Sequence, residues 1–237
     1  MSLKKLQFLL FIFIVFQTTN ACTKKDTSLA QIQIPSEQIS EEDIQLPFDE
    51  KRAKFTPMEA IKDLDQKLES YQTRSTLTAE ETEQNKRLKK EIIQGTFDIK
   101  ELSRLALDTH WDTLPDKERR EFTHLMTSLL ERKAIFSKEQ VKGNDKPYKI
   151  VYKGEKYLDA AKQKALVFNT IFVPSEKIDL DIKYELIYTP TGWKIYDVIV
   201  DEASLVENYK FQFDTIIRKN GYSNLKERMQ KKLKEMD

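Results

Sequence analysis

The sequence predicts an α+β domain, because two kinds of hydrophobic spacing follow one another along the chain. Apolar residues recur at helical spacing over residues 56–130 and again over residues 205–233. Between these regions, residues 180–186 alternate between apolar and charged side chains, as a strand with one solvated face does. Helices, then antiparallel strands, then further helices are typical of the α+β class.

Four helix starts are predicted before the strands. Residues 56–59 (Thr-Pro-Met-Glu) combine an N-cap, a proline at the first helical position and a glutamate that can return a hydrogen bond. Residues 78–81 and 98–101 repeat the cap and the acidic residue, and Pro115 opens the fourth helix. The predicted buried faces are Met58, Ile61, Leu64 and Leu68; Leu88, Ile92 and Ile93; Ile99, Leu102, Leu105 and Ala106; and Phe122, Leu125, Met126, Leu129 and Leu130.

Three further strands accompany residues 180–186. Residues 148–152 form the first, and residues 166–173 and 193–200 are mostly apolar, β-branched or aromatic, which predicts strands covered on both faces. Residues 189–192 (Thr-Pro-Thr-Gly) predict the turn of a hairpin. Two helices follow, the first with Leu205, Tyr209, Phe213 and Ile216, the second with Leu225, Met229 and Leu233.

Residues 1–21 have the order of a secretory signal peptide. Two lysines precede residues 6–16, a stretch that is apolar except for Gln7, and the small residue Ala21 ends the region. At about 1.5 Å per residue, this stretch is too short to cross a ~30 Å hydrocarbon layer as a permanent span. The sequence therefore predicts export.

Cys22, the only cysteine, follows the predicted cleavage point. Its position resembles that of the acylated cysteine of bacterial lipoproteins, although residues 19–21 (Thr-Asn-Ala) lack the usual leucine-like residue three before the cysteine. The alternative is plain cleavage after Ala21 with Cys22 an incidental thiol. We favour acylation, because a lone thiol is unusual in an exported protein. Residues 22–55 predict a flexible acidic tether with a reach of roughly 30 Å, and residues 56–237 predict the folded domain.

Composition narrows the classes of function. Lys and Arg number 40 against 39 Asp and Glu, and removal of residues 1–21 takes away two lysines, so no basic excess is available to bind nucleic acid. One cysteine excludes an internal disulfide, and two histidines, His110 and His124, leave little material for a metal centre. No GxSxG, HExxH, P-loop or dinucleotide motif occurs. We therefore expect no metal, no cofactor and no enzyme activity.

Asp197 keeps one catalytic alternative open. It interrupts the apolar strand predicted over residues 193–200, and a buried carboxylate with a raised pKa can act as a proton-transfer base. The other interpretation is a structural carboxylate that accepts backbone or hydroxyl hydrogen bonds. We favour the structural role, because no second polar group is evidently placed to polarise a substrate.

Residues 193–213 carry a resemblance to a known family. The block contains a tryptophan, Tyr-Asp-Val, Ser-Leu, Asn-Tyr-Lys and Gln-Phe, here at Trp193, residues 196–198, 204–205, 208–210 and 212–213. It resembles a block of the toluene-tolerance family, the Mla-type periplasmic phospholipid-binding proteins (Mla stands for maintenance of lipid asymmetry). Residues 221–225 (Gly-Tyr-Ser-Asn-Leu) are similar to the Gly-Tyr-Asp-x-Leu of the same family.

The resemblance extends over residues 56–230 in the same order. His110-Trp111, Arg119, Phe122 and Leu129-Leu130 are similar to the helical segment of the family. Three positions depart from its pattern: Glu202 replaces a glycine, Lys210 an arginine and Ala134 a tyrosine. The glutamate predicts a different turn before the helix that contains Leu205.

The resemblance implies helices packed over a strongly curved, cone-like, mostly antiparallel sheet, with an apolar cavity between them that holds lipid acyl chains. It implies a periplasmic, non-enzymatic carrier of phospholipid or a related two-chain lipid, an auxiliary component of an ABC-type lipid transporter that also meets a membrane donor or acceptor complex. An acylated Cys22 would anchor it to a membrane, and we expect a monomer. The candidate cavity walls are Leu102, Leu105, Phe122, Leu125, Leu180, Ile182, Tyr184, Leu186, Tyr209 and Phe213.

Two alternatives stay open beside the carrier. The first is a cone-fold isomerase or hydrolase that uses Asp197 as its base. The second is a structural surface lipoprotein with a solid core, because an apolar stripe that lines a cavity and one that fills a core look alike in sequence.

Overall fold

The computed structural model describes residues 55–71, 76–132, 149–173 and 177–236. The predicted signal peptide (1–21), the predicted lipidation site Cys22 and the predicted tether up to residue 54 lie outside the described residues. Tyr148 and Ala134 also lie outside them.

The described chain runs from helices through one sheet to helices again, which confirms the α+β class. The helices before the sheet are α2 (Pro57–Glu69), α3 (Ala79–Thr96), α4 (Ile99–Leu107), α5 (Thr109–Thr113) and α6 (Asp116–Arg132). The strands are β1 (Lys149–Tyr157), β2 (Lys164–Val173), β3 (Ile178–Thr189), β4 (Gly192–Val200) and β5 (Ala203–Ser204), and α7 (Leu205–Asn220) and α8 (Tyr222–Glu235) follow. Strands that are consecutive in sequence pair antiparallel, in the order β1-β2-β3-β4-β5.

Three of the four predicted helix starts before the sheet are confirmed by their caps, and α6 begins at Asp116, directly after Pro115. At α2, the Thr56 hydroxyl accepts a hydrogen bond from the Glu59 amide at 3.2 Å, and the Glu59 carboxylate accepts one from the Thr56 amide at 2.7 Å. Thr78 and Glu81 form the same reciprocal pair at α3. Asp98 caps α4, and the short helix α5 and the two-residue strand β5 are additions to the predicted elements.

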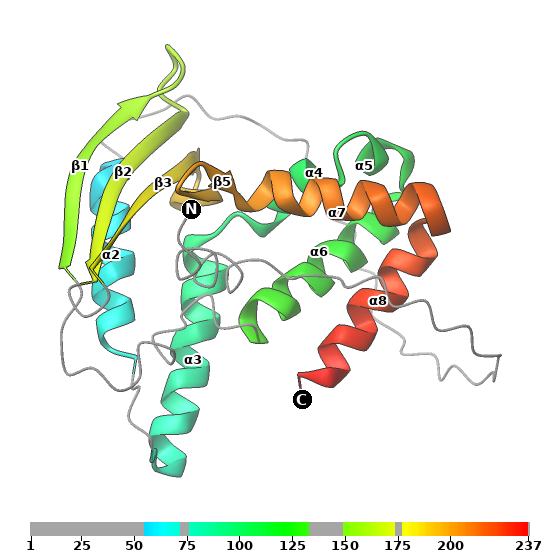
Figure 1. Ribbon diagram of the computed structural model, residues 1–237, viewed down its shortest axis with the longest axis horizontal. Coiled ribbons are helices and arrows are strands. Elements are labelled where there is room, and N and C mark those ends of the chain that lie inside the picture. Colours follow the sequence, from blue (N-terminus) through cyan, green and yellow to red (C-terminus); the bar gives the residue numbers. More distant parts are fainter. Residues whose placement is uncertain (1–54, 72–75, 133–148, 174–176, 237) are drawn as a thin grey trace.

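Helices from both ends of the chain pack on the sheet (Figure 1). α2 lies against β1, β2 and β4, whereas α3, α4 and α7 contact β4. α6 and α8 pack on the helices rather than forming the main cover of the strands, since α6 contacts α3 and α4, and α8 contacts α6 and α7. Among the described residues, no helix is both long enough and apolar enough to span a bilayer.

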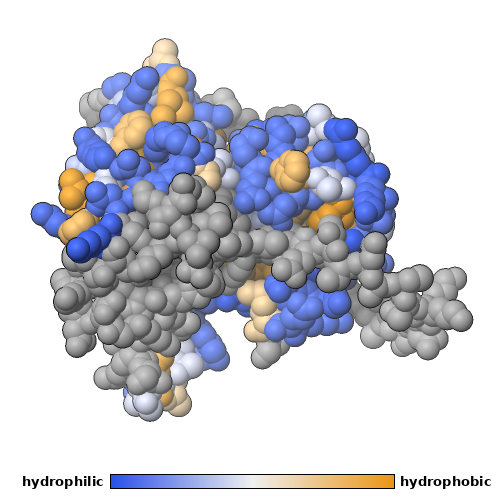
Figure 2. Space-filling model, viewed as in Figure 1, coloured by the Kyte–Doolittle hydropathy of each residue, from blue (hydrophilic) through white to orange (hydrophobic). Residues whose placement is uncertain are grey.

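The two faces of the sheet differ in burial. On β2, Ala165, Val167 and Asn169 are buried, whereas Leu166 and Phe168 on the other face are only half-buried and Phe172 is 39% exposed. The prediction that residues 166–173 are covered on both faces is therefore wrong for the outer face. Figure 2 shows hydrophobic residues among the hydrophilic ones over the strands on this side of the molecule.

Two irregularities in register bend the sheet. The β1–β2 pairing shifts between Tyr152 and Gly154, and the β3–β4 pairing shifts between Glu185 and Leu186, so that Tyr196 is an extra residue in β4. Bulges of this kind bend a strand and increase its twist. Figure 1 shows the resulting curvature, most clearly in β1.

The turn between β4 and β5 places Glu202 in an unfavourable backbone conformation. Val200 pairs with Ala203, and the two residues between them, Asp201 and Glu202, have φ angles of 46° and 68°. Two consecutive left-handed residues are typical of a tight hairpin turn that favours glycine at its second position. The Glu202 carboxylate forms an ion pair with the Lys183 ammonium group at 2.6 Å. Because the Glu202 side chain is 79% exposed, this pair contributes little to stability.

We predict that Glu202→Gly raises the free energy of unfolding by about 1 kcal/mol, because glycine adopts a positive φ without the Cβ penalty. Urea denaturation of the purified domain measures this change. Glu202→Ala is the matched control: it removes the ion pair but keeps the Cβ, and we expect it to stay within about 0.5 kcal/mol of the unmodified chain. A destabilised glycine variant would contradict this account of the turn.

Candidate functional site

The candidate site lies between the inner face of the sheet and the helices that cover it. On β3, the alternating residues Leu180, Ile182, Tyr184 and Leu186 are all buried, with at most 9% of each side chain exposed. Their register partners on the same face continue the apolar surface: Val167 lies opposite Tyr184, and Val200 opposite Ile182. The strand candidates predicted from sequence therefore form one continuous apolar surface.

The helical candidates form a second apolar group. Leu102, Phe122, Tyr209 and Phe213 are almost completely buried, and Leu105 and Leu125 are partly buried against the same core. Phe213 contacts Phe122 edge to face, with ring centroids 5.6 Å apart, and stacks on Tyr209 at 5.3 Å. The aromatic contacts place Phe122 among α6, α7 and α8, where Tyr222 also meets it at 6.4 Å.

All ten candidates thus belong to one buried apolar cluster, but they divide between two locations. Leu180, Ile182, Tyr184 and Leu186 lie on the sheet, and the aromatic helical candidates pack against one another. A lipid tail between sheet and helices would meet the strand residues directly. Phe122 and Leu125 lie on α6, whose main contacts are with other helices, so they support such a site from behind.

Polar groups inside this cluster were not anticipated from sequence. Asn169, on the inner face of β2, and Ser103, on α4, are 2% and 0% exposed, and neither Asn169 Oδ1 nor Ser103 Oγ has a hydrogen-bond partner in the described structure. Beside Asn169, the Tyr152 hydroxyl donates to the Asp65 carboxylate at 2.6 Å. The sequence contained this information, because Asn169 lies two residues after Val167 in the predicted strand and alternation places both side chains on the same face.

Asp197 has the structural role favoured from sequence. Its Oδ1 accepts hydrogen bonds from the Val198 amide at 2.8 Å and the Val206 amide at 3.0 Å, and its Oδ2 accepts one from the Ser204 hydroxyl at 2.5 Å. Burial raises the pKa of this carboxyl, and the three donors oppose that shift. The carboxylate therefore joins β4 to the first turn of α7, with both of its oxygens occupied.

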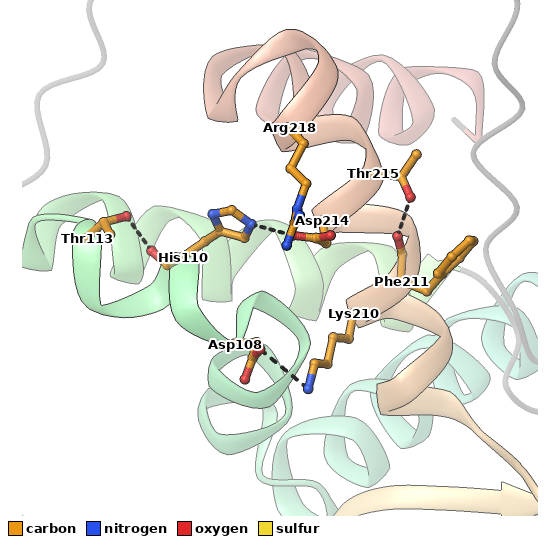
Figure 3. A network of polar contacts seen from close by, with 8 residues as sticks. All are labelled: Asp108, His110, Thr113, Lys210, Phe211, Asp214, Thr215 and Arg218. Atoms are coloured by element: carbon orange, nitrogen blue, oxygen red, sulfur yellow. Dashed lines mark hydrogen bonds and ion pairs between the residues drawn. The ribbon is translucent and has the colours of Figure 1, made fainter.

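Neither histidine belongs to the apolar cluster. His124 is exposed on α6, and His110 Nε2 lies 2.9 Å from Asp214 Oδ1, which links α5 to α7 (Figure 3). Hydrogen bonds to the Asp214 carboxyl lower its pKa, and the bond from Arg218 has a larger effect than the one from His110. Lys210 forms a further ion pair with Asp108 at 3.4 Å. Within the described ranges, no three His, Cys, Asp or Glu side chains are grouped as metal ligands.

Comparison with known proteins decides the family. The family model described as MlaC protein matches residues 62–231, more than half of the chain. The chain belongs to the MlaC protein family. The Mla-type resemblance inferred from the sequence blocks is thereby confirmed.

A solved structure has a fold similar to that of this chain. The chain is similar to the phospholipid-binding protein from Ralstonia solanacearum, solved in complex with a phospholipid, with 20% sequence identity and a TM-score of 0.55. The similarity covers 76% of this chain and 95% of that one. Comparison with curated proteins found no significant match. MlaC membership points to a binding or transport protein rather than an enzyme, and the neighbour supports the fold.

We predict that Asp197→Ala lowers the free energy of unfolding by about 2–3 kcal/mol, because two backbone amides and the Ser204 hydroxyl lose their acceptor. Urea denaturation measures this loss. Asp197→Asn is the matched control, since its Oδ1 still accepts from both amides, and we expect it to cost less than about 1 kcal/mol. Equal losses in the two variants would show that the negative charge, rather than the hydrogen bonds, is what stabilises this junction.

Proposed function

We propose that this chain is an exported carrier that holds phospholipid acyl chains between its sheet and its helices. It shuttles the lipid between membrane complexes of a double-membraned bacterial envelope. Membership of the MlaC family is the observation that carries the proposal. The protein from Ralstonia solanacearum, which has a similar fold and was solved in complex with a phospholipid, also supports the proposal.

The physical demands of lipid transport fit the two apolar surfaces. Transfer of each CH₂ group of an acyl chain from water into an apolar interior is favourable by about 0.8 kcal/mol of free energy. A carrier therefore needs an apolar interior more than it needs reactive groups. The inner residues of β3, together with Leu102, Tyr209 and Phe213, supply such an interior. On this basis we assign eight of the ten candidates to the wall of the lipid site, and Phe122 and Leu125 to the layer behind that wall.

The proposal includes partners and a place in the cell. The carrier exchanges lipid with an ABC-type transporter and with a membrane donor or acceptor complex, in the periplasm. Acylation of Cys22 would confine it to one membrane, with the tether setting its range. Release of a lipid requires helices to part from the sheet, which α2, α3, α4 and α7 contact.

The enzyme alternative has less support than the carrier. Asp197 has both oxygens occupied by structural hydrogen bonds. If Asp197 were a catalytic base, Asp197→Asn would abolish turnover, whereas a carrier with this substitution keeps its lipid. A surface lipoprotein with a solid core predicts instead that no lipid is extracted from the purified protein.

We predict that residues 23–237, purified without detergent, contain one two-chain lipid per chain. Native mass spectrometry gives the bound mass, and organic extraction then identifies the lipid class. A stoichiometric lipid supports the carrier. A bare polypeptide that stays bare after incubation with phospholipid vesicles would overturn the proposal and favour the solid core.

We predict that Ile182→Glu abolishes lipid retention without preventing export. Ile182 is 6% exposed on the inner face of β3, and the substitution places a carboxylate in this apolar wall. Phe172→Glu is the matched control, because it introduces the same charge on the outer face and should keep the lipid. Native mass spectrometry compares the two proteins, and circular dichroism shows that both are folded. Unchanged lipid content in Ile182→Glu would count against this wall.

A further inference from the structure

Asn169 is a buried amide side chain in an apolar wall. It is 2% exposed at the centre of β2, on the face that also carries Ala165 and Val167. Its Oδ1 has no hydrogen-bond partner in the described structure. An unsatisfied buried acceptor is costly, so its presence at this position calls for a partner.

The neighbouring side chains do not supply this partner. Ile182, directly opposite on β3, is apolar and is itself one of the proposed lipid contacts. Tyr152, directly opposite on β1, has a single hydroxyl proton, and that proton is donated to Asp65 at 2.6 Å. Directly opposite residues on one face of a sheet are the closest cross-strand neighbours, so the residues best placed to pair with this acceptor leave it unsatisfied.

We propose that Asn169 hydrogen-bonds the bound lipid where its acyl chain is linked, and that it favours lipids with an N–H or O–H donor there. An ester linkage offers only acceptors, which can accept a hydrogen bond from Asn169 Nδ2 but leave Oδ1 unpaired. An amide linkage or a hydroxyl next to it offers a donor and an acceptor, which match both ends of the carboxamide. The inference rests on the proposed function and adds to it the chemical class of the preferred lipid.

A buried water molecule is the other source of a donor at Asn169. Water would satisfy Oδ1 whichever lipid is bound, so it predicts no preference between linkages. The two explanations therefore differ in the selectivity of the protein.

The test is a competition between two lipids that share a headgroup. The exported chain, carrying Cys22→Ser so that no acyl group is attached there, is stripped of lipid and incubated with vesicles of equimolar phosphatidylcholine and sphingomyelin. Both lipids have a phosphocholine headgroup, but the first is ester-linked and the second has an amide N–H and a neighbouring hydroxyl. Native mass spectrometry gives the ratio of the two complexes. We expect the amide-linked lipid to be favoured by about three- to tenfold, the effect of one net hydrogen bond.

Asn169→Leu has a similar shape without polar atoms and should reduce this ratio to about that of the vesicles. Because it removes an unsatisfied buried group, it should also raise the melting temperature of the lipid-free protein. Thr170→Val is the matched control: it replaces a polar side chain on the opposite face of β2 and should leave the preference unchanged. Asn169→Val, with a side chain suited to a strand, replaces the leucine variant if that one does not fold.

The outcomes separate the inference from the proposed function. Uptake of both lipids in the vesicle ratio by the unsubstituted chain would overturn the role of Asn169 and leave the carrier intact. A preference that persists in Asn169→Leu would overturn it as well. If the unsubstituted chain takes up neither lipid, the carrier itself fails, and the inference fails with it.

Discussion

The architecture depends on one junction, where the helices that precede the sheet are hydrogen-bonded to β4. The Asp98 amide donates to the Ile195 carbonyl at 2.8 Å, and Phe97 forms a parallel bridge with Ile195. The Lys194 ammonium group donates to the Gly95 carbonyl next to it. Burial lowers the pKa of Lys194. These contacts fix the end of α3 and the start of α4 on the sheet, so the helical layer built on α4 has a defined position over the strands.

A second junction of the same strand secures the C-terminal helices. Asp197 holds the first turn of α7, and α7 then packs along α4. Two further contacts continue this attachment along α7: the Lys210–Asp108 ion pair at the end of α4, and the His110–Asp214 contact from α5 (Figure 3). α2, by contrast, is attached near the other edge of the sheet, where Glu155 on β1 accepts from the Met58 amide at 2.7 Å. The two sides of the molecule are thus held by separate sets of contacts.

Local rules were sufficient to predict most of the fold. The caps at Thr56, Thr78 and Asp98 depend on residues three apart, and the hairpin at 189–192 depends on adjacent ones, so both follow from sequence. The register shift at Glu185 and Leu186 was not predictable, because it depends on how β4 pairs with β3. The exposure of Phe172 has the same origin: an apolar strand does not say which of its faces a helix will cover.

The candidate site followed from sequence only in part. Alternation on β3 predicted which residues point inward, and the structure places all four in the core. Periodicity did not distinguish helical residues that face the sheet from those that pack on other helices, as Phe122 does against Phe213. Asn169 lies two residues after Val167, so alternation along β2 marks it as an inward residue even though its side chain is polar.

The order of the sheet also has a consequence for self-association. Terminal strands expose backbone groups that invite pairing with another chain, and proteins counter this with short or lysine-bearing edges. β5, at one end, has only two residues, and β1, at the other, carries the exposed Lys149, Lys153 and Lys156. Strand-to-strand aggregation is thereby discouraged at both ends, which matters most under the proposed function, in which the helices part from the sheet to exchange a lipid.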